Sequence, residues 1–260
     1  MNVMKKDTDF NFAKKHTNWI NPEYTYLKNV KIVEYDIKSA GLSVIKFTKI
    51  LPADEIEKLE SMDKHKRTVK EGLLQRDNPK IAEKIVNTLG DVRKAFAYLN
   101  DIYPPSVISI KKDAMFLVNM TPRVTVIKDI FEFRKKSTYT SYLRVDKKEF
   151  YYNSLLGTLD TKGFSEDSIS KQSNYLLKDI KSLMKSSEKV DQVSLYKFLK
   201  NYRSKYLNRE LPIETYRELD TGCFRVNDYL LEEVDSEMID SIDISQNYIS
   251  YILPIINMML

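Results

Sequence analysis

Two short apolar runs, each with one aspartate where the run stops or turns, most constrain the fold of this chain. The first is segment 30–37, which carries Asp36, and the second is the strand–turn–strand segment 107–118, whose turn holds Asp113. Short runs of β-branched and apolar residues predict buried strands, so each carboxylate is expected at the edge of a sheet. Two such carboxylates brought together form a site for a divalent metal ion, whereas each one alone is the usual residue of a turn.

Helical periodicity fills the interval between these two runs. The segment 53–77 is highly charged and carries Arg67 and Lys70 about one helical turn apart, and segment 80–102 repeats apolar residues at helical spacing. Gly41, before these helices, is expected to let the backbone turn tightly. The helical pair either projects basic residues that grip a triphosphate or simply presents a solvated basic face.

Three further segments have strand composition, at 124–127, 139–145 and 147–152, and helical periodicity dominates from about residue 160 onward. The pattern predicts an α+β fold with an antiparallel sheet, an inserted helical hairpin and a mostly helical C-terminal region. Residues 1–29, which show no sustained period, are expected to form an N-terminal arm.

Lys147 and Lys148 lie beside a run of aromatic residues that includes Tyr151. Such a combination is typical of surfaces that contact nucleic-acid phosphates and stack on bases, and equally of a charged strand end over an aromatic core. The chain has 42 Lys and Arg against 37 Asp and Glu, and a pI near 8.9, which permits contact with nucleic acid without requiring it.

The cysteine and histidine content excludes several site classes. One cysteine, Cys223, rules out a disulfide framework within the chain and a cysteine-based zinc site, and two histidines leave little for histidine-based metal binding. No signal peptide and no membrane-spanning run are expected, so the chain is predicted to be cytoplasmic, in the host cytoplasm if it is viral. An acidic stretch, 228–243, and an apolar tail, 248–260, are candidate surfaces for a protein partner, although the tail could instead dock on the body.

Three of these segments resemble motifs of the family B DNA polymerase palm, in the compact phage or mobile-element form that lacks an exonuclease domain. The first motif of that family is Asp-x-x-Ser-Leu-Tyr-Pro-Ser, and residues 36–43 keep the Asp and both Ser positions. The third motif, Asp-Thr-Asp-Ser, is similar to residues 111–114, where Lys111 replaces the first aspartate and Asp113 keeps the second. The family's Lys-Lys-x-Tyr segment is similar to residues 147–151.

The resemblance implies a palm over 30–155 with small fingers inserted at about 53–102, and a thumb-like helical region over 160–260. It further implies template-directed nucleotidyl transfer by a two-metal mechanism, with nucleoside triphosphates and a primer–template as partners and Mg²⁺ or Mn²⁺ as cofactor. The residues that it implicates are Asp36 and Asp113 as catalytic metal ligands, Arg67, Lys70, Ser39 and Gly41 for the triphosphate, and Lys147, Lys148 and Tyr151 for the primer–template.

The chain also departs from the family. The second motif has no clean counterpart, and Gly41 stands where the family has a bulky tyrosine that crowds the ribose 2′-OH, so weak discrimination against ribonucleotides is expected. Together with Lys111, these departures leave two alternatives open. One is a catalytically inactive, polymerase-like nucleic-acid-binding protein or accessory of replication or transcription, and the other is an α+β protein of unrelated function.

Overall fold

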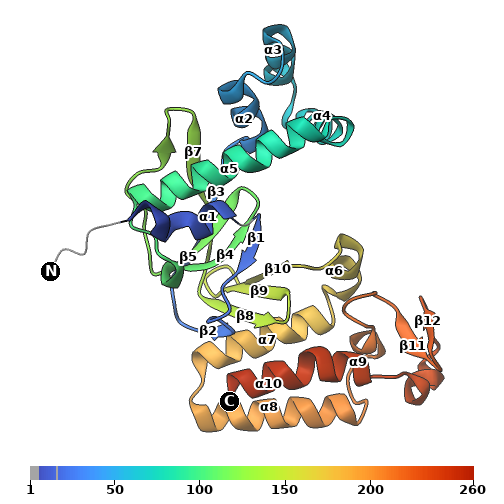
Figure 1. Ribbon diagram of the computed structural model, residues 1–260. Coiled ribbons are helices and arrows are strands. Elements are labelled where there is room, and N and C mark those ends of the chain that lie inside the picture. Colours follow the sequence, from blue (N-terminus) through green and yellow to red (C-terminus); the bar gives the residue numbers. More distant parts are fainter. Residues whose placement is uncertain (1–5, 16) are drawn as a thin grey trace, which may run out of the picture. The chain divides into compact units, whose positions relative to one another are not determined.

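The computed structural model describes residues 6–15 and 17–260, and the chain divides into two compact units (Figure 1). Unit 1 comprises residues 1–21 and 31–138, and unit 2 comprises residues 22–30 and 139–260. Each unit has a hydrophobic core of its own. Residues 139–155, which the sequence groups with the first strands, therefore lie in the C-terminal unit.

Unit 1 is built on a six-stranded sheet. Its strands, in spatial order, are β1 (Asn18–Ile20), β4 (Val107–Lys111), β5 (Ala114–Val118), β3 (Ile32–Ile37), β7 (Phe131–Tyr139) and β6 (Val126–Ile127). The pairs β1–β4, β4–β5, β5–β3 and β6–β7 are antiparallel. An N-terminal 3₁₀ turn, η1 (Asp7–Phe10), leads into α1 (Asn11–Lys15).

The connection from β3 to β4 is helical. It consists of α2 (Ala40–Thr48), α3 (Ala53–Ser61), α4 (Lys64–Asp77), α5 (Pro79–Leu99) and the 3₁₀ turn η2 (Pro104–Ser106). The α5 helix lies across the sheet, where its apolar side and α1 form a core with alternate residues of β3 (Figure 1). The side chains of Asp63 and Asn78 cap α4 and α5 by accepting backbone N–H groups at 3.0 and 3.1 Å.

Unit 2 contains a four-stranded sheet ordered β10 (Thr158–Lys162), β9 (Lys148–Asn153), β8 (Ser141–Val145) and β2 (Tyr26–Leu27), and all of its pairs are antiparallel. Helices and a small hairpin follow, namely α6 (Glu166–Gln172), α7 (Leu176–Lys189), α8 (Gln192–Leu207), η3 (Ile213–Tyr216), β11 (Phe224–Val226), β12 (Tyr229–Leu231), η4 (Ser236–Ser241), α9 (Ser245–Asn247), the π-helical turn η5 (Tyr248–Ile252) and α10 (Leu253–Met259). The helices α7, α8 and α10 form the core of this unit with one face of the sheet (Figure 1).

The expected α+β class with antiparallel sheets is confirmed, and the helices expected at about 53–102 are α3, α4 and α5. The assignment of these parts to palm, fingers and thumb stays a prediction. Among the described residues, no helix is both long and apolar enough to cross a membrane.

The expected tight turn at Gly41 was wrong. Gly41 is the second residue of α2, and the left-handed backbone conformation falls on Ser39, with φ of 48°. The helix therefore begins earlier than the apolar periodicity indicated, because Ala40 and Gly41 occupy a first turn whose side chains contribute little to the hydrophobic pattern.

Candidate functional site

Asp36 and Asp113 meet at one end of the sheet in unit 1. Asp36 is opposite Ala114 in the antiparallel register of β3 and β5, and Asp113 precedes Ala114 in the turn between β4 and β5. The backbone N–H of Ile37 donates to the Asp113 carbonyl at 3.2 Å, which fixes the end of β3 against the turn. The four helices from α2 to α5 separate these residues in sequence, so their proximity is a property of the fold.

Strand alternation sends the β3 carboxylates to one face. Val33, Tyr35 and Ile37 enter the core with α5, so Glu34 and Asp36 lie on the opposite face of the strand. Burial raises the pKa of Asp113, and the charge of Asp36 raises it further. The two carboxylates thus repel each other where β3 meets the turn, while a backbone hydrogen bond and the charges of Lys136 and Lys112 lower the pKa of Asp113 and oppose the rise.

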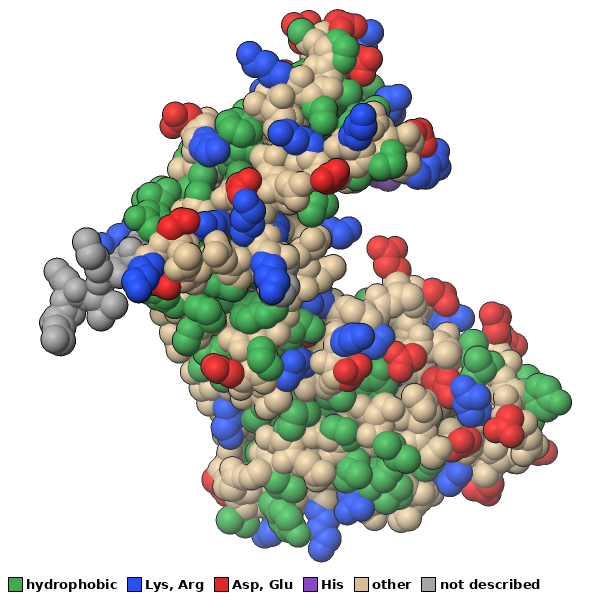
Figure 2. All heavy atoms as spheres, viewed as in Figure 1, with side chains coloured by type: hydrophobic (Ala, Val, Ile, Leu, Met, Phe, Trp, Pro, Cys, Tyr) green, Lys and Arg blue, Asp and Glu red, His purple; other side chains and the backbone are tan. Residues whose placement is uncertain are grey.

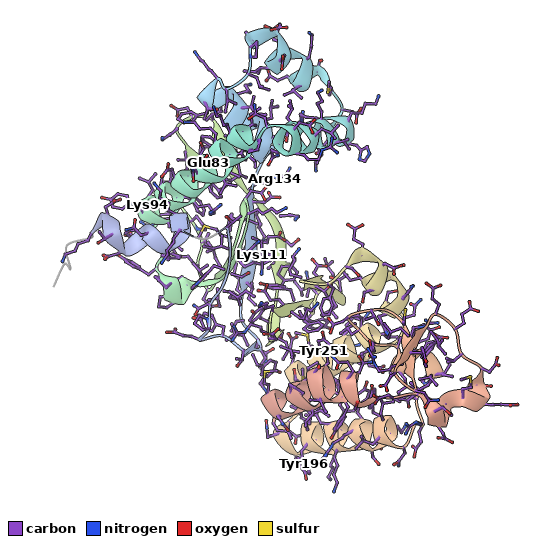
Figure 3. The ribbon with its side chains drawn as sticks, turned by 45° about the vertical axis from the view of Figure 1, so that its right-hand side comes forward. Glu83, Lys94, Lys111, Arg134, Tyr196 and Tyr251 are labelled. Carbon is purple, nitrogen blue, oxygen red and sulfur yellow. The ribbon has the colours of Figure 1, made fainter. Side chains whose placement is uncertain are left out.

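The neighbouring strand β7 supplies two cations to this face. Arg134 Nε lies 2.9 Å from Asp36 Oδ1, and Lys136 Nζ lies 2.9 Å from Glu34 Oε1. The Lys38 backbone N–H donates to the Glu132 carbonyl at 2.9 Å. Residue numbers therefore fall from 38 to 34 on the β3 side as they rise from 132 to 136 on β7, which means that the two strands are antiparallel. Arg134 and Lys111, the last residue of β4, extend from this sheet (Figure 3).

A buried arginine supports the turn that carries Asp113. Arg93, on α5, is 2% exposed; its Nε donates to the Ala13 carbonyl at 3.0 Å and its Nη1 donates to the Lys112 carbonyl. Burial lowers the pKa of Arg93 to about 10, and the charge of Asp113 opposes that shift. Arg93 thus ties α1 and the β4–β5 turn to α5.

The structure brings together three of the four residues expected at a triphosphate. Arg67 Nη2 donates to Ser39 Oγ at 3.3 Å, and Ser39 directly precedes α2, which contains Gly41. Glu71, one turn after Arg67, lies 3.9 Å from it (Oε1 to Nε) and fills the space beside Gly41. The space beside Gly41, where the resemblance implies that a bulky tyrosine is missing, is therefore occupied by the Glu71 carboxylate, whose pKa is raised by burial.

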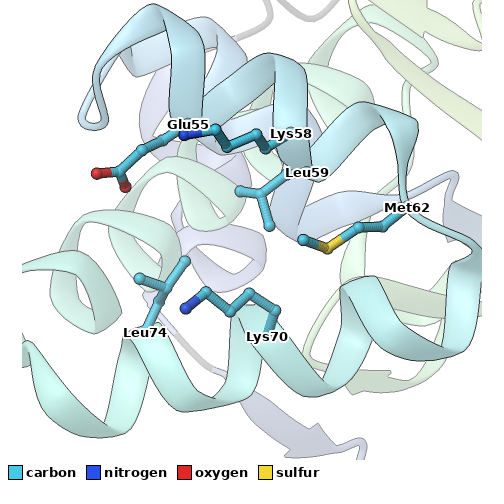
Figure 4. A pocket seen from close by; sticks show the side chains of 6 residues that line it. All are labelled: Glu55, Lys58, Leu59, Met62, Lys70 and Leu74. Carbon is cyan, nitrogen blue, oxygen red and sulfur yellow. The ribbon is translucent and has the colours of Figure 1, made fainter.

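Lys70 is not part of this cluster. It lines a cavity of about 280 Å³ between α3 and α4, in which Leu59, Met62 and Leu74 are apolar and Glu55 and Lys58 polar (Figure 4). One helical position separates Lys70 from Glu71, so the two side chains leave α4 in different directions.

The residues expected to track a primer–template lie in unit 2. Lys147 is exposed in the turn between β8 and β9, whereas Lys148 Nζ lies 2.8 Å from Asp220 Oδ1 and donates to the Gly163 carbonyl at 2.7 Å. Tyr151 is buried and donates its hydroxyl to Glu149 Oε1 at 2.9 Å. Within unit 2, Lys147 is thus the member of this set whose charge faces solvent.

The two candidate partner segments differ in their surroundings. Residues 228–243 include β12 and η4, and Figure 2 shows acidic side chains gathered around the β11–β12 hairpin. The apolar tail docks on its own unit, because Tyr251, Ile252, Ile255, Ile256 and Met259 are buried in its core. A role of either segment in binding a partner stays a prediction.

The aspartate pair is the candidate metal site of unit 1. Across residues 6–15 and 17–260, no group of three or more His, Cys, Asp or Glu side chains is arranged to hold a metal ion. Mg²⁺ commonly uses one or two protein carboxylates and completes its shell with water and substrate phosphates, so Asp36 and Asp113 fit such an ion as a donor set.

Sequence reasoning missed Glu34, Arg134 and Lys136 on the sheet, and Glu71 beside Gly41. The spacing of Glu34 and Asp36 by two residues was an available signal, because such residues share one face of a strand. Phe131 and Phe133 likewise mark one face of β7, but the charged run 134–136 masks the alternation. Contacts between β3 and β7 and between α4 and α2 have no local signature.

Comparison with known proteins identifies a phage family. The family model described as "Bacteriophage PBS1 gene 130 protein" matches residues 8–260, and no curated protein matches the chain. The match agrees with the phage character of the resemblance, and its description names no activity. With nearly the whole sequence covered, the chain belongs to the bacteriophage PBS1 gene 130 protein family.

Proposed function

We propose that this protein catalyses template-directed nucleotidyl transfer, with Asp36 and Asp113 as the carboxylates that hold the divalent cations. The observation that carries the proposal is the meeting of these two aspartates at one end of a single sheet, on β3 and on the β4–β5 turn. Phosphoryl transfer requires positioning and charge neutralisation more than covalent chemistry from the protein. A pair of carboxylates that holds the divalent cations would therefore supply the central part of such an active site.

The residues present fit the role. Mg²⁺ or Mn²⁺ bound at the pair would supply activation of the primer 3′-OH and neutralisation of the triphosphate. Pairing of β3 with β5 positions Asp36 opposite Ala114, and Arg93 holds the turn of Asp113 by donating to the Lys112 carbonyl. Both carboxylates therefore keep their positions when a substrate arrives, as preorganised ligands require.

The triphosphate would bind at the start of α2. Ser39 Oγ and the Arg67 guanidinium are already within hydrogen-bonding distance, and a guanidinium suits phosphate oxygens because it donates two parallel hydrogen bonds. The Glu71 carboxylate has to turn away from Arg67 before the guanidinium can bind a phosphate. It can do so because it lies at the end of a flexible side chain.

A second candidate function is nucleic-acid binding without catalysis, as an accessory of replication or transcription. The observation that favours it is the Arg134–Asp36 ion pair, together with Lys111 in the place of a family carboxylate. A guanidinium paired with Asp36 and a lysine in place of a family carboxylate both reduce the negative charge available to divalent cations. Binding to nucleic acid would then rest on exposed basic residues such as Lys147.

Primer extension separates the two functions. The full-length protein is given a primer–template and Mg²⁺ or Mn²⁺, with deoxynucleotides and ribonucleotides offered separately, and binding to the same primer–template is followed by fluorescence anisotropy. Nucleotidyl transfer predicts extension that Asp36→Asn and Asp113→Asn each abolish while binding persists. Asp77→Asn, at a side chain that is 63% exposed on the far end of α4, is the matched control.

Each outcome favours one function. Extension lost in both site variants and kept in the control supports catalysis at the aspartate pair. Salt-sensitive binding without extension by the wild-type protein supports the accessory function. Extension that survives Asp36→Asn and Asp113→Asn together refutes the assignment of the site.

A further inference from the structure

The Arg134–Asp36 pair is asymmetric in its exposure. The Asp36 side chain is 13% exposed and the Arg134 side chain is 46% exposed. The guanidinium can therefore swing into solvent at little cost, whereas the carboxylate stays where β3 places it. A cation that takes the place of Arg134 would find Asp36 fixed and partly desolvated.

The second ion pair between the two strands, Lys136–Glu34, has the more deeply buried carboxylate. The Glu34 side chain is 3% exposed and lies against Lys136, so release of Lys136 would remove an ion pair from a buried carboxylate, which is costly. Lys136 is thus expected to remain with Glu34 while Arg134 exchanges, and the two pairs have different roles although they are adjacent.

The other carboxylate of the site also attracts Arg134. The hydrogen bond from Arg134 Nε to Asp36 Oδ1, at 2.9 Å, holds the guanidinium in place, and the negative charges of Glu132 and Asp113 also attract it. The β7 strand fixes the start of this side chain, because Phe131 and Phe133 are buried in the core and leave Arg134 on the face of Asp36.

We propose that Arg134 is an internal competitor for the divalent cation, because its guanidinium holds Oδ1 of Asp36, one of the two carboxylate oxygens that a metal ion at this residue would use. The inference rests on the proposed function in assigning a metal ion to Asp36 and Asp113. It adds a residue of β7 that lies outside the three motif-like segments 36–43, 111–114 and 147–151.

The consequence is weak metal binding by the free protein. Removal of the competing guanidinium is expected to tighten the dissociation constant for Mn²⁺ about tenfold, the scale on which one partly buried ion pair changes an equilibrium. Arg134→Lys keeps the charge without the planar donor group and is expected to fall between the wild-type protein and Arg134→Gln.

The experiment measures Mn²⁺ binding to the full chain by electron paramagnetic resonance, without nucleotide or nucleic acid. The variants are Arg134→Gln, Arg134→Lys, and Arg134→Gln combined with Asp36→Asn. Lys38→Gln is the matched control, because Lys38, directly after β3, pairs with Glu132 of β7 at 3.2 Å and both of those side chains are at least half exposed. Circular dichroism confirms that each variant is folded.

Tighter binding by Arg134→Gln, unchanged binding by Lys38→Gln and loss of binding on adding Asp36→Asn is the expected result. Equal binding by the wild-type protein and Arg134→Gln, or binding by neither, overturns the inference. The proposed function is judged separately by primer extension: a variant that gains Mn²⁺ at Asp36 but never extends a primer upholds the competitor and removes the polymerase. If the wild-type protein extends a primer while it and Arg134→Gln bind Mn²⁺ equally, the proposed function stands and the competitor role of Arg134 is refuted.

Discussion

The Glu71 carboxylate occupies the space that a side chain at position 41 would need, since a Cβ built on Gly41 would overlap Glu71 Oε2. This contact joins α4 to the first turn of α2, next to the Arg67–Ser39 hydrogen bond. Gly41 therefore leaves room for the Glu71 carboxylate, and the absence of a side chain there does not create an empty pocket.

A double-mutant cycle tests this contact. Gly41→Ala alone pushes Glu71 away from Arg67, and because the obstructing atoms end a flexible side chain the free energy of unfolding should change by less than about 1 kcal/mol. In a Glu71→Ala background the same substitution should stabilise, by up to about 1 kcal/mol, since alanine is favoured over glycine in a helix. Urea unfolding of the four proteins gives the coupling energy. Equal effects of Gly41→Ala in both backgrounds would show that the side chains do not touch.

The sequence was sufficient to place Asp36 and Asp113, because both depend on local patterns. A short alternating run predicts a strand, a charged interruption between two apolar runs predicts a turn, and the residues at those positions follow directly. Helical periodicity over 53–102 likewise marked the inserted helices, since apolar residues at helical spacing form one face of α5.

Partners from distant parts of the chain could not be predicted in the same way. Arg134 is 98 residues from Asp36, and their contact depends on which strand β7 adds to and in which register. A shift of that register by one residue would turn Arg134 to the other face, and a run of three basic residues gives no sign of which one faces Asp36. The tight approach of Glu71 to Gly41 depends in turn on how α4 packs on α2.

The raised pKa of Asp113 makes stability depend on pH. Burial and then Asp36 raise this pKa above the unfolded value of about 3.9, so the folded protein binds more protons and the carboxylate lowers stability above that range. Asp113→Asn should therefore raise the melting temperature at neutral pH and change it little at a pH of about 3, where the carboxyl is protonated in both states. Differential scanning calorimetry at both pH values measures this. A lower melting temperature for the variant at neutral pH would contradict the prediction.

The effect of Mg²⁺ on the melting temperature provides a second test of Asp113. Mg²⁺ that binds the folded state should raise the melting temperature of the wild-type protein in proportion to the logarithm of its concentration and leave Asp113→Asn unaffected. Sodium chloride at matched ionic strength controls for screening, which acts on both proteins alike. An equal response of the two proteins to Mg²⁺ would mean that Asp113 does not hold the ion.

Arg93 is expected to be among the most sensitive positions of unit 1. Arg93→Met removes the donors of the Ala13 and Lys112 carbonyls, and the expected loss is about 2–4 kcal/mol of the free energy of unfolding. Arg76→Met, at a side chain that is 71% exposed on α4, should change it by less than about 0.5 kcal/mol. Urea unfolding compares the two. Similar losses in both variants would show that the support of the β4–β5 turn does not depend on Arg93.

Lys147 and Lys148 are adjacent in sequence, but their substitution should affect different properties, namely nucleic-acid binding for Lys147 and stability for Lys148. Lys148 pairs with Asp220, donates to the Gly163 carbonyl and lies 4.5 Å from the Phe164 ring centroid, so Lys148→Gln should cost about 1–2 kcal/mol of stability. Lys147 is exposed, so Lys147→Gln should leave stability within about 0.5 kcal/mol. If Lys147 contacts a phosphate, its loss should instead weaken binding to a primer–template and reduce the salt dependence by about one contact. Fluorescence anisotropy over a salt series and urea unfolding of both variants measure this division, and a salt slope that Lys147→Gln leaves unchanged would exclude the turn between β8 and β9 from the nucleic-acid surface.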